Sequence, residues 1–198
     1  TYMNRHLFSQ VNIDLRDTHL PDGSAKDLDA ECENYEKLLR KFNGIDLQLL
    51  GIGRTGHIGF NEPLSAIRSR TRVKALAPTT MAQNAKYFGG EERMPRRAIT
   101  MGVGTILEAR RCIMLATGAD KAEIVAKAVE GPVTAMISAT ALQLHPHCTV
   151  VVDAALGAGF DDVRALKSRL DALAAFSKSE GFERAVLTFK RAANIIRK

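Results

Sequence analysis

The sequence lacks any long hydrophobic run. No apolar stretch in its 198 residues approaches the ~18 residues that a membrane-spanning helix needs. It also lacks a basic and then apolar leader of the kind that directs secretion. Its 45% hydrophobic and 25% charged residues are typical of an ordinary globular protein. We therefore expect a cytoplasmic protein that does not associate with membranes.

Cysteine is scarce, and metal-ligand spacing is absent. Cys32, Cys112 and Cys148 are an odd number without a CxxC motif, so we expect reduced thiols. Cys112 and Cys148 lie in apolar runs and should behave as small core residues. His145 and His147 have no Asp or Glu nearby at ligand spacing, so a structural role is favoured over a metal site.

The net charge of +6 is concentrated near the C-terminus. Residues 160–198 hold nine Lys or Arg against five Asp or Glu. Their apolar spacing predicts two amphipathic helices with no strand between them, so we expect a basic helical tail over 153–198. Such a tail can attract nucleic acid or phosphate ligands, although a solvated helix face explains the same charge more simply.

Short apolar runs alternate with helical patterns over residues 1–152. This alternation predicts one α/β domain of the doubly wound class, with a mostly parallel sheet covered on both faces. The expected strands lie at 45–52, 71–76, 98–101, 112–117 and 148–152. The expected helices lie at 27–42, 79–88, 103–109, 121–130 and 139–142.

A glycine-rich loop over residues 51–63 follows the first of these strands. Four glycines in nine residues let the backbone turn tightly, at the strand end where α/β proteins bind ligands. His57 and Glu62 lie five residues apart around Gly59, so the loop can fold both side chains into one pocket. An imidazole exchanges protons near neutral pH, and a neighbouring carboxylate can orient it and favour its charged form. The pair is therefore a candidate acid–base centre.

Two other interpretations fit parts of this loop. The spacing of Gly51, Gly53 and Gly56 mimics a dinucleotide fingerprint, but His57 and Pro63 follow where a helix should begin. The second strand also lacks the acidic residue that would contact a ribose about 20 residues later. The remaining alternative is a structural loop with a surface histidine and a helix-capping glutamate.

The complete loop reads GIGRTGHIGFNEP and resembles the signature of the glucosamine-6-phosphate deaminase (isomerase) family. Residues 29–36, 69–74, 100–107 and 142–146 also resemble that family, in the same order. The resemblance covers about residues 1–152. It also implies that the family's phosphate loop and proton-shuttling Asp would precede Thr1. The first Met is Met3, so we expect the chain to be part of a longer protein or a fusion.

The resemblance implies a reaction on an aminosugar phosphate. His57 would open the sugar ring by moving the O5 proton, and Glu62 would tune that histidine. A general base would move a proton between C2 and C1, after which hydrolysis releases ammonia and leaves fructose 6-phosphate. This chemistry requires neither a metal nor an organic cofactor. Thr55 occupies a position where many members carry Asp or Asn, so the histidine lacks one charged partner.

The resemblance also suggests ligand-binding positions. Lys86 and Lys121 match phosphate-binding positions. The glycine-rich loop over residues 51–63 supplies two further candidates, Gly53 and Gly56. Lys121 lies at a predicted strand–helix junction, where backbone N–H groups attract anions.

Three further positions match an allosteric site for an N-acetylated sugar phosphate that some members carry. They are Ser65, Arg72 and Lys74. For Arg72 and Lys74, the exposed face of a strand is the simpler interpretation.

Residues 154–198 are similar to the C-terminal helical end of the glycyl-tRNA synthetase β subunit, which implies a site near tRNA phosphates. Three hypotheses follow. The chain is a deaminase, a non-catalytic sugar-phosphate-binding domain, or a nucleic-acid-associated module that depends on its tail. We also expect a homo-oligomer.

Overall fold

The computed structural model describes residues 2–153 and 156. The expected tail helices after residue 160 lie outside this part of the chain. The described residues belong to two units, one containing residues 2–20 and the other starting at Pro21. The first contains helix α1 (Tyr2–His6) and two 3₁₀ turns, Phe8–Gln10 and Leu15–Asp17.

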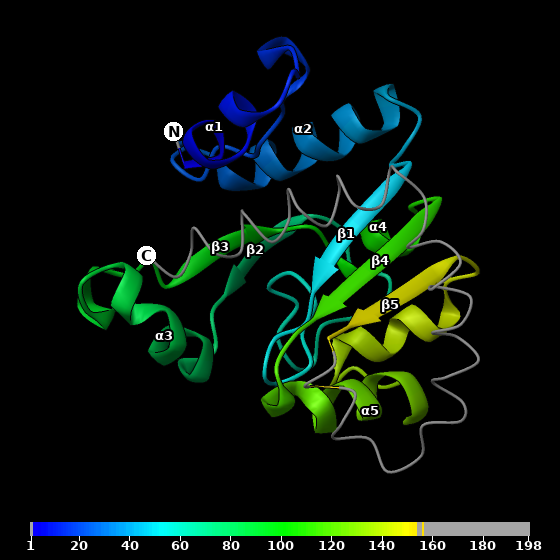
Figure 1. Cartoon of the computed structure of the whole chain (residues 1–198). Helices are drawn as coiled ribbons and strands as arrows, with labels where there is room; N and C mark the ends of the chain where they lie inside the picture. The colour runs from blue at the N-terminus through cyan, green and yellow to red at the C-terminus, as the bar shows by residue number, and fades with distance from the viewer. Residues whose placement is uncertain (1, 154–155, 157–198) are drawn as a thin grey trace. The chain divides into compact units, whose positions relative to one another are not determined.

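The second unit is built around a three-stranded parallel sheet, which Figure 1 shows with its strands side by side and pointing the same way. Its strands are β1 (Leu47–Gly51), β4 (Arg111–Ala116) and β5 (Cys148–Val152), in the order β1-β4-β5. The register places Leu50, Met114 and Val150 in one row across the sheet. The predicted α/β fold with a mostly parallel sheet is therefore confirmed.

The core lies on the face of the sheet that carries this row. Residues from α4 (Val103–Leu107), α5 (Ala122–Glu130) and the 3₁₀ segment Ser138–Leu144 complete it. On the opposite face, Ile113 and Leu115 are only partly buried. The sequence predicts helices on both faces of the sheet. Within the described residues, α4, α5 and the 3₁₀ segment all pack into the core on this one face.

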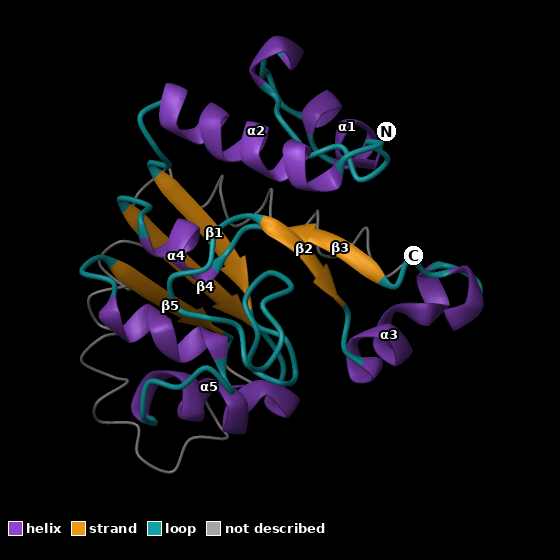
Figure 2. Cartoon of the chain, turned by 180° about the vertical axis from the view of Figure 1, so that it is seen from behind, coloured by secondary structure: helices purple, strands orange, loops and turns teal. Residues whose placement is uncertain are grey.

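Two of the predicted strands form a separate antiparallel pair (Figure 2). They are β2 (Arg72–Ala75) and β3 (Arg97–Thr100). β2 alternates basic and apolar residues, a pattern typical of a half-exposed strand and costly in the doubly buried interior of a parallel sheet. Helix α3 (Pro78–Asn84) follows β2 and continues into the 3₁₀ turns Ala85–Tyr87 and Glu91–Arg93.

Helix α2 (Leu28–Lys41) begins where the sequence predicts, with the Asp27 side chain accepting a hydrogen bond from Ala30 N at 2.9 Å. Its inner face carries Cys32, as expected, and also Glu36, which the apolar pattern did not reveal. Glu36 is 5% exposed.

The Glu36 carboxylate ties α2 to the start of β2 and to α4. Its Oε1 accepts from Thr71 N (2.9 Å), Thr71 Oγ1 (2.5 Å) and Thr105 Oγ1 (2.7 Å). Its Oε2 accepts from the Arg70 guanidinium at 2.6 and 3.1 Å. These bonds outweigh the opposing effect of burial and lower the pKa of Glu36 to about 2.

The cysteines and His145 have structural roles. All three cysteines are free thiols, and burial raises the pKa of Cys112 and of Cys148 to about 11, so both are poor nucleophiles. His145 is buried, with Nε2 2.7 Å from Ala109 O and Nδ1 accepting from His147 N at 3.0 Å. None of the helices in the described residues is both long enough and apolar enough to span a membrane.

Candidate functional site

The glycine-rich loop closes into a tight turn immediately after β1. Gly53 N donates to His57 O at 2.9 Å, and Gly56 N donates to Gly53 O at 2.9 Å. Gly56 has φ +77°, a left-handed conformation that glycine adopts without strain. A Cβ on Gly53 would lie 2.2 Å from His57 Nε2, so the imidazole lies directly against the Gly53 backbone. Both glycines are thus required by the turn and by the position of the histidine.

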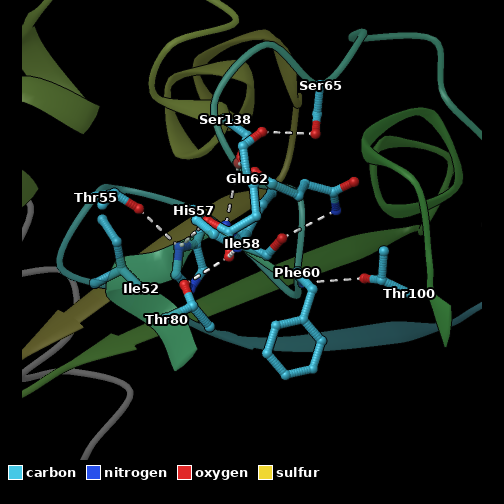
Figure 3. A network of polar contacts seen from close by, with 12 residues as sticks. Ile52, Thr55, His57, Ile58, Phe60, Glu62, Ser65, Thr80, Thr100 and Ser138 are labelled. Atoms are coloured by element: carbon cyan, nitrogen blue, oxygen red, sulfur yellow. Dashed lines mark hydrogen bonds and ion pairs between the residues drawn. The ribbon is translucent and has the colours of Figure 1, made fainter. Parts of the chain in front are cut away.

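His57 and Glu62 meet, as the sequence predicts. Their side chains are 12% and 5% exposed, and Nδ1 of His57 lies 3.3 Å from Oε2 of Glu62. Thr55 Oγ1 lies 2.8 Å from the same Nδ1. Figure 3 shows Thr55 and Glu62 both directed toward the imidazole. Nδ1 of His57 therefore has two potential partners. Among the described residues, Nε2 forms no comparable hydrogen bond or ion pair.

The two oxygens of Glu62 have different environments. Oε1 accepts from Thr80 Oγ1 at 2.5 Å and from Ala77 N at 3.2 Å. Oε2 is buried and has no hydrogen-bond partner in the part of the chain that the structure describes. Its nearest ionisable neighbour is the His57 Nδ1 already described. The carboxylate is therefore anchored on one side and available to the imidazole on the other.

Asn61 holds the loop between these two catalytic candidates. It is fully buried, and its Nδ2 donates to Ile58 O at 3.0 Å and to Met101 O at 2.8 Å. Its Oδ1 accepts from Arg72 at 3.0 Å. Ser138 Oγ donates to Asn61 O at 2.7 Å, which joins the loop to the 3₁₀ segment before β5.

Several residues of this network were not singled out from the sequence. Thr80 and Ser138 lie far along the chain from the loop, and nothing in their local pattern distinguishes them from other hydroxyl residues. Asn61 belongs to the loop motif, but its three hydrogen bonds depend on tertiary contacts. The place of Asn61 inside the loop motif was the signal that the sequence offered, because burial is visible only in the structure.

Burial favours the neutral form of His57. Burial lowers the pKa of His57 below its usual value, the Glu62 charge acts in the raising direction, and the Lys121 charge lowers it again. A neutral imidazole carries one proton, and a carboxylate beside Nδ1 favours placing the proton there. Nε2 is then a free base over Gly53.

The structure brings one of the two candidate phosphate lysines to this loop. Lys121 is half-buried, and its Nζ donates to Ile52 O at 3.0 Å, just beyond the end of β1. Burial lowers the pKa of Lys121. Lys86 is exposed after α3, with its Nζ 5.1 Å from the centre of the Tyr87 ring, and it has no described contact with the His57 cluster.

Two of the three allosteric candidates contact the loop. Ser65 is buried and donates to Glu62 O at 2.7 Å, and Arg72 reaches Asn61 as described above. Lys74 is half-buried in β2. Ser65 and Arg72 therefore contribute to the loop's structure, and a role for any of the three in regulation stays a prediction.

The rest of the described chain offers no competing centre of this kind. No cluster of three or more His, Cys, Asp or Glu side chains suited to a metal ion occurs among residues 2–153 and 156. Two surface cavities lie beside α2 and are lined in part by Arg40 and Arg70, and neither includes His57 or Glu62.

The comparison with known protein families agrees with the loop. Residues 1–151 match the family described as glucosamine-6-phosphate isomerases/6-phosphogluconolactonase. The chain belongs to this family. The family expected from the loop motif is therefore confirmed over the region that carries it.

Curated relatives from bacteria are glucosamine-6-phosphate deaminases. The one from Cellvibrio japonicus (strain Ueda107) is 48% identical over 166 residues, which cover 84% of this chain and 63% of that protein. The one from Streptomyces avermitilis is 58% identical over 152 residues, covering 76% of this chain and 58% of that protein. The chain thus spans about three fifths of the length of these relatives.

Solved structures from the same family have the same fold. A monomeric glucosamine-6-phosphate deaminase is 42% identical, with a TM-score of 0.77 over 80% of this chain and 66% of that one. A 6-phosphogluconolactonase from Trypanosoma cruzi is 19% identical, with a TM-score of 0.52 over 78% of this chain and 57% of that one. The second likeness concerns the fold alone.

Proposed function

We propose that this chain is the His–Glu part of a glucosamine-6-phosphate deaminase, which converts glucosamine 6-phosphate to fructose 6-phosphate and ammonia. The observation that carries the proposal is the contact of His57 Nδ1 with Glu62 Oε2 at 3.3 Å in the family's loop. The deaminases that share about half of its residues over this region support the substrate.

In this proposal His57 acts as the acid–base group of ring opening. Its Nε2 takes the proton of the O1 hydroxyl and delivers it to the ring oxygen O5 as the C1–O5 bond breaks and the C1 carbonyl forms. Glu62 stabilises the imidazolium that exists in between. The low exposure of both side chains strengthens their electrostatic interaction. Thr55 holds Nδ1 without adding a charge.

The substrate phosphate is assigned to lysine ammonium groups. Lys121 is the stronger candidate because its Nζ lies beside the carboxyl end of β1, where α/β folds bind ligands. Lys86 is the second candidate, and its exposed position leaves its ammonium group accessible. Gly53 and Gly56 belong to the loop that is assigned to the ligand, although Gly56 itself is buried against Ile124 and Ile137.

Ammonia release tests the proposal. The full chain should release ammonia from glucosamine 6-phosphate, and His57→Ala should abolish release, while neither protein should act on glucose 6-phosphate, which has no amine. Lys121→Ala should weaken binding more than Lys86→Ala. Release of ammonia by His57→Ala at the parent rate would contradict the role of the histidine.

A non-catalytic sugar-phosphate-binding domain is the alternative, and one observation favours it. Thr55 cannot carry a charge, so His57 lacks one charged partner. A ligand-induced rise in Tm without ammonia release would support this alternative. Absence of both effects would contradict the deaminase and the binding proposals together.

Three finer features stay predictions. A cytoplasmic location and a homo-oligomer are expected, and sedimentation of the full chain tests the second. Binding of tRNA through residues 154–198 is what the third hypothesis predicts from the basic charge of the tail, for which a solvated helix face is the simpler explanation. A salt-sensitive mobility shift with tRNA that is lost when these residues are removed would support it.

A further inference from the structure

We propose that Thr80 is a positioning residue, whose hydroxyl fixes the Glu62 carboxylate so that Oε2 faces His57. The effect of Thr80 on catalysis rests on the proposed function, whereas its effect on the orientation of Glu62 does not. It assigns a role to a side chain of α3, which lies 18 residues beyond the carboxylate that it binds.

The hydrogen bond from Thr80 is short and buried. Thr80 is 2% exposed, and its Oγ1 donates to Glu62 Oε1 at 2.5 Å. A hydroxyl has one proton to donate, so this bond uses the only donor that Thr80 has on its side chain. A hydrogen bond to an ionised acceptor is among the stronger ones in proteins.

A second donor on the same oxygen fixes the plane of the carboxylate. Ala77 N donates to Oε1 at 3.2 Å, while Oε2 receives no hydrogen bond from the described residues. Rotation of the carboxylate plane away from this orientation would break both contacts, because neither oxygen would then face the two donors. Thr80 and Ala77 together therefore hold the plane in which one carboxylate oxygen, here Oε2, lies toward the imidazole.

The backbone around Thr80 is itself held in place. Asn84 Nδ2 donates to Thr80 O at 2.8 Å, within the last turn of α3. The turn that presents Thr80 is thus fixed from both ends, by Glu62 and by Asn84. A hydroxyl that is itself held in place can fix the orientation of the carboxylate that it binds.

The consequence for His57 concerns which ring nitrogen holds the proton. With Oε2 facing Nδ1 at 3.3 Å, the proton is favoured on Nδ1 and the lone pair on Nε2. Thr55 Oγ1, at 2.8 Å from Nδ1, is compatible with either tautomer because a hydroxyl both donates and accepts. Of these two partners of Nδ1, only the carboxylate discriminates between the tautomers, so its orientation favours Nε2 as the base.

The test is a measurement of the His57 tautomer by ¹H–¹⁵N NMR of the full chain, without ligand. The resonances are assigned by comparison with His57→Ala. Parent protein and Thr80→Ser should both show the Nδ1–H form, because serine keeps the hydroxyl. Thr80→Val should show a mixture of both tautomers.

Two further variants separate positioning from general destabilisation. Thr105→Val removes another buried hydroxyl, one that donates to Glu36 instead of Glu62, and should leave the His57 tautomer unchanged. Ala77→Pro removes the second donor to Oε1 at a residue whose φ of −66° already suits proline. It should shift the tautomer in the same direction as Thr80→Val, and it gives a result if Thr80→Val does not fold.

Kinetics provide the second measurement. Thr80→Val should lower kcat by roughly tenfold with KM nearly unchanged, since misorientation of a catalytic group affects the transition state more than binding. An unchanged tautomer in both Thr80→Val and Ala77→Pro would overturn the inference. If the parent chain released no ammonia, the proposed function would fail, while the NMR comparison would still decide the role of Thr80.

Discussion

Two buried glutamates in this molecule have nearly equal exposure and opposite surroundings. Glu36 and Glu62 are 5% and 4% exposed. Both oxygens of Glu36 accept hydrogen bonds, from two threonines and an arginine. Glu62 accepts hydrogen bonds on Oε1 alone, and its Oε2 faces an imidazole. Burial is therefore similar at the two sites, and the distribution of donors differs.

This difference separates a structural carboxylate from the one to which we assign a catalytic role. A carboxylate with every lone pair satisfied is held in its ionised form and has no capacity left for a reacting partner. A carboxylate with one buried oxygen that accepts no hydrogen bond can still stabilise a positive charge that forms nearby during a reaction. The two are also connected, since Glu36 binds Thr71 and the next residue, Arg72, binds Asn61 beside Glu62.

The largest expected effect is on catalysis at the Glu62 site. His57→Ala should reduce ammonia release by about 10²–10⁴-fold, the usual contribution of a general acid–base group. The free energy of unfolding should change far less, because the imidazole edge is not part of the hydrophobic core. Ammonia assays and urea titrations of the same preparations check both. Asp46→Asn, at an exposed partner of Arg110, is the control and should leave both quantities nearly unchanged.

The next effect is on stability at the Glu36 site. Glu36→Gln should lower the free energy of unfolding at pH 7 by about 3 kcal/mol, since charged hydrogen bonds and a partly buried ion pair are lost. Turnover by the protein that remains folded should fall much less than in His57→Ala. Urea denaturation gives the first quantity, and assays at 10 °C give the second. A turnover loss as large as that of His57→Ala would break the distinction between the two carboxylates.

The pH dependence of stability should separate the two sites further. The pKa of Glu36 is about 2 in the folded protein, so its contribution is present above an unfolded pKa of about 4.3 and is lost as pH falls from there toward 2. The pKa of His57 is lowered by burial, so the unfolded chain takes up protons first and stability begins to fall below about pH 6.5. Thermal unfolding across pH 2–8 measures both windows.

Matched variants assign each window. Glu36→Gln should remove most of the loss of stability between about pH 4.3 and 2. His57→Gln should remove the slope just below about pH 6.5 and leave the acid limb in place. A single acid transition that neither substitution changes would show that other groups control the stability of the molecule in acid.

The smallest effect is expected at Thr55. Thr55→Val removes the 2.8 Å contact with His57 Nδ1 but leaves Glu62 in place, so ammonia release should fall by only about threefold to tenfold. The free energy of unfolding should change by about 1 kcal/mol or less. Steady-state kinetics checks the first value, and a loss as large as that of His57→Ala would show that Thr55 is the principal partner of the histidine.

Much of the fold and the centre of the site follow from local sequence patterns. Glycine spacing and the following His57 and Glu62 predict the loop, because a tight turn is a local property. Apolar runs predict β1, β4 and β5 for the same reason. The antiparallel pairing of β2 with β3 could not be predicted, since strand partners depend on contacts between distant segments.

Buried polar contacts were the least predictable part of the molecule. Glu36 lies one position from an apolar stripe and looks like an exposed helix residue until Thr71 and Thr105 are brought to it. Thr80 shows no sequence feature that marks it as a partner of Glu62. Such contacts depend on tertiary placement, which no local periodicity encodes.

The most direct test of the account is an NMR titration of His57 in the parent chain and in Glu62→Gln. The parent pKa should lie below about 6.5, and the substitution should lower it further, because the carboxylate charge is the influence that raises it against burial and Lys121. An unchanged or higher pKa in Glu62→Gln would show that Oε2 does not act on the imidazole, and would contradict the central claim.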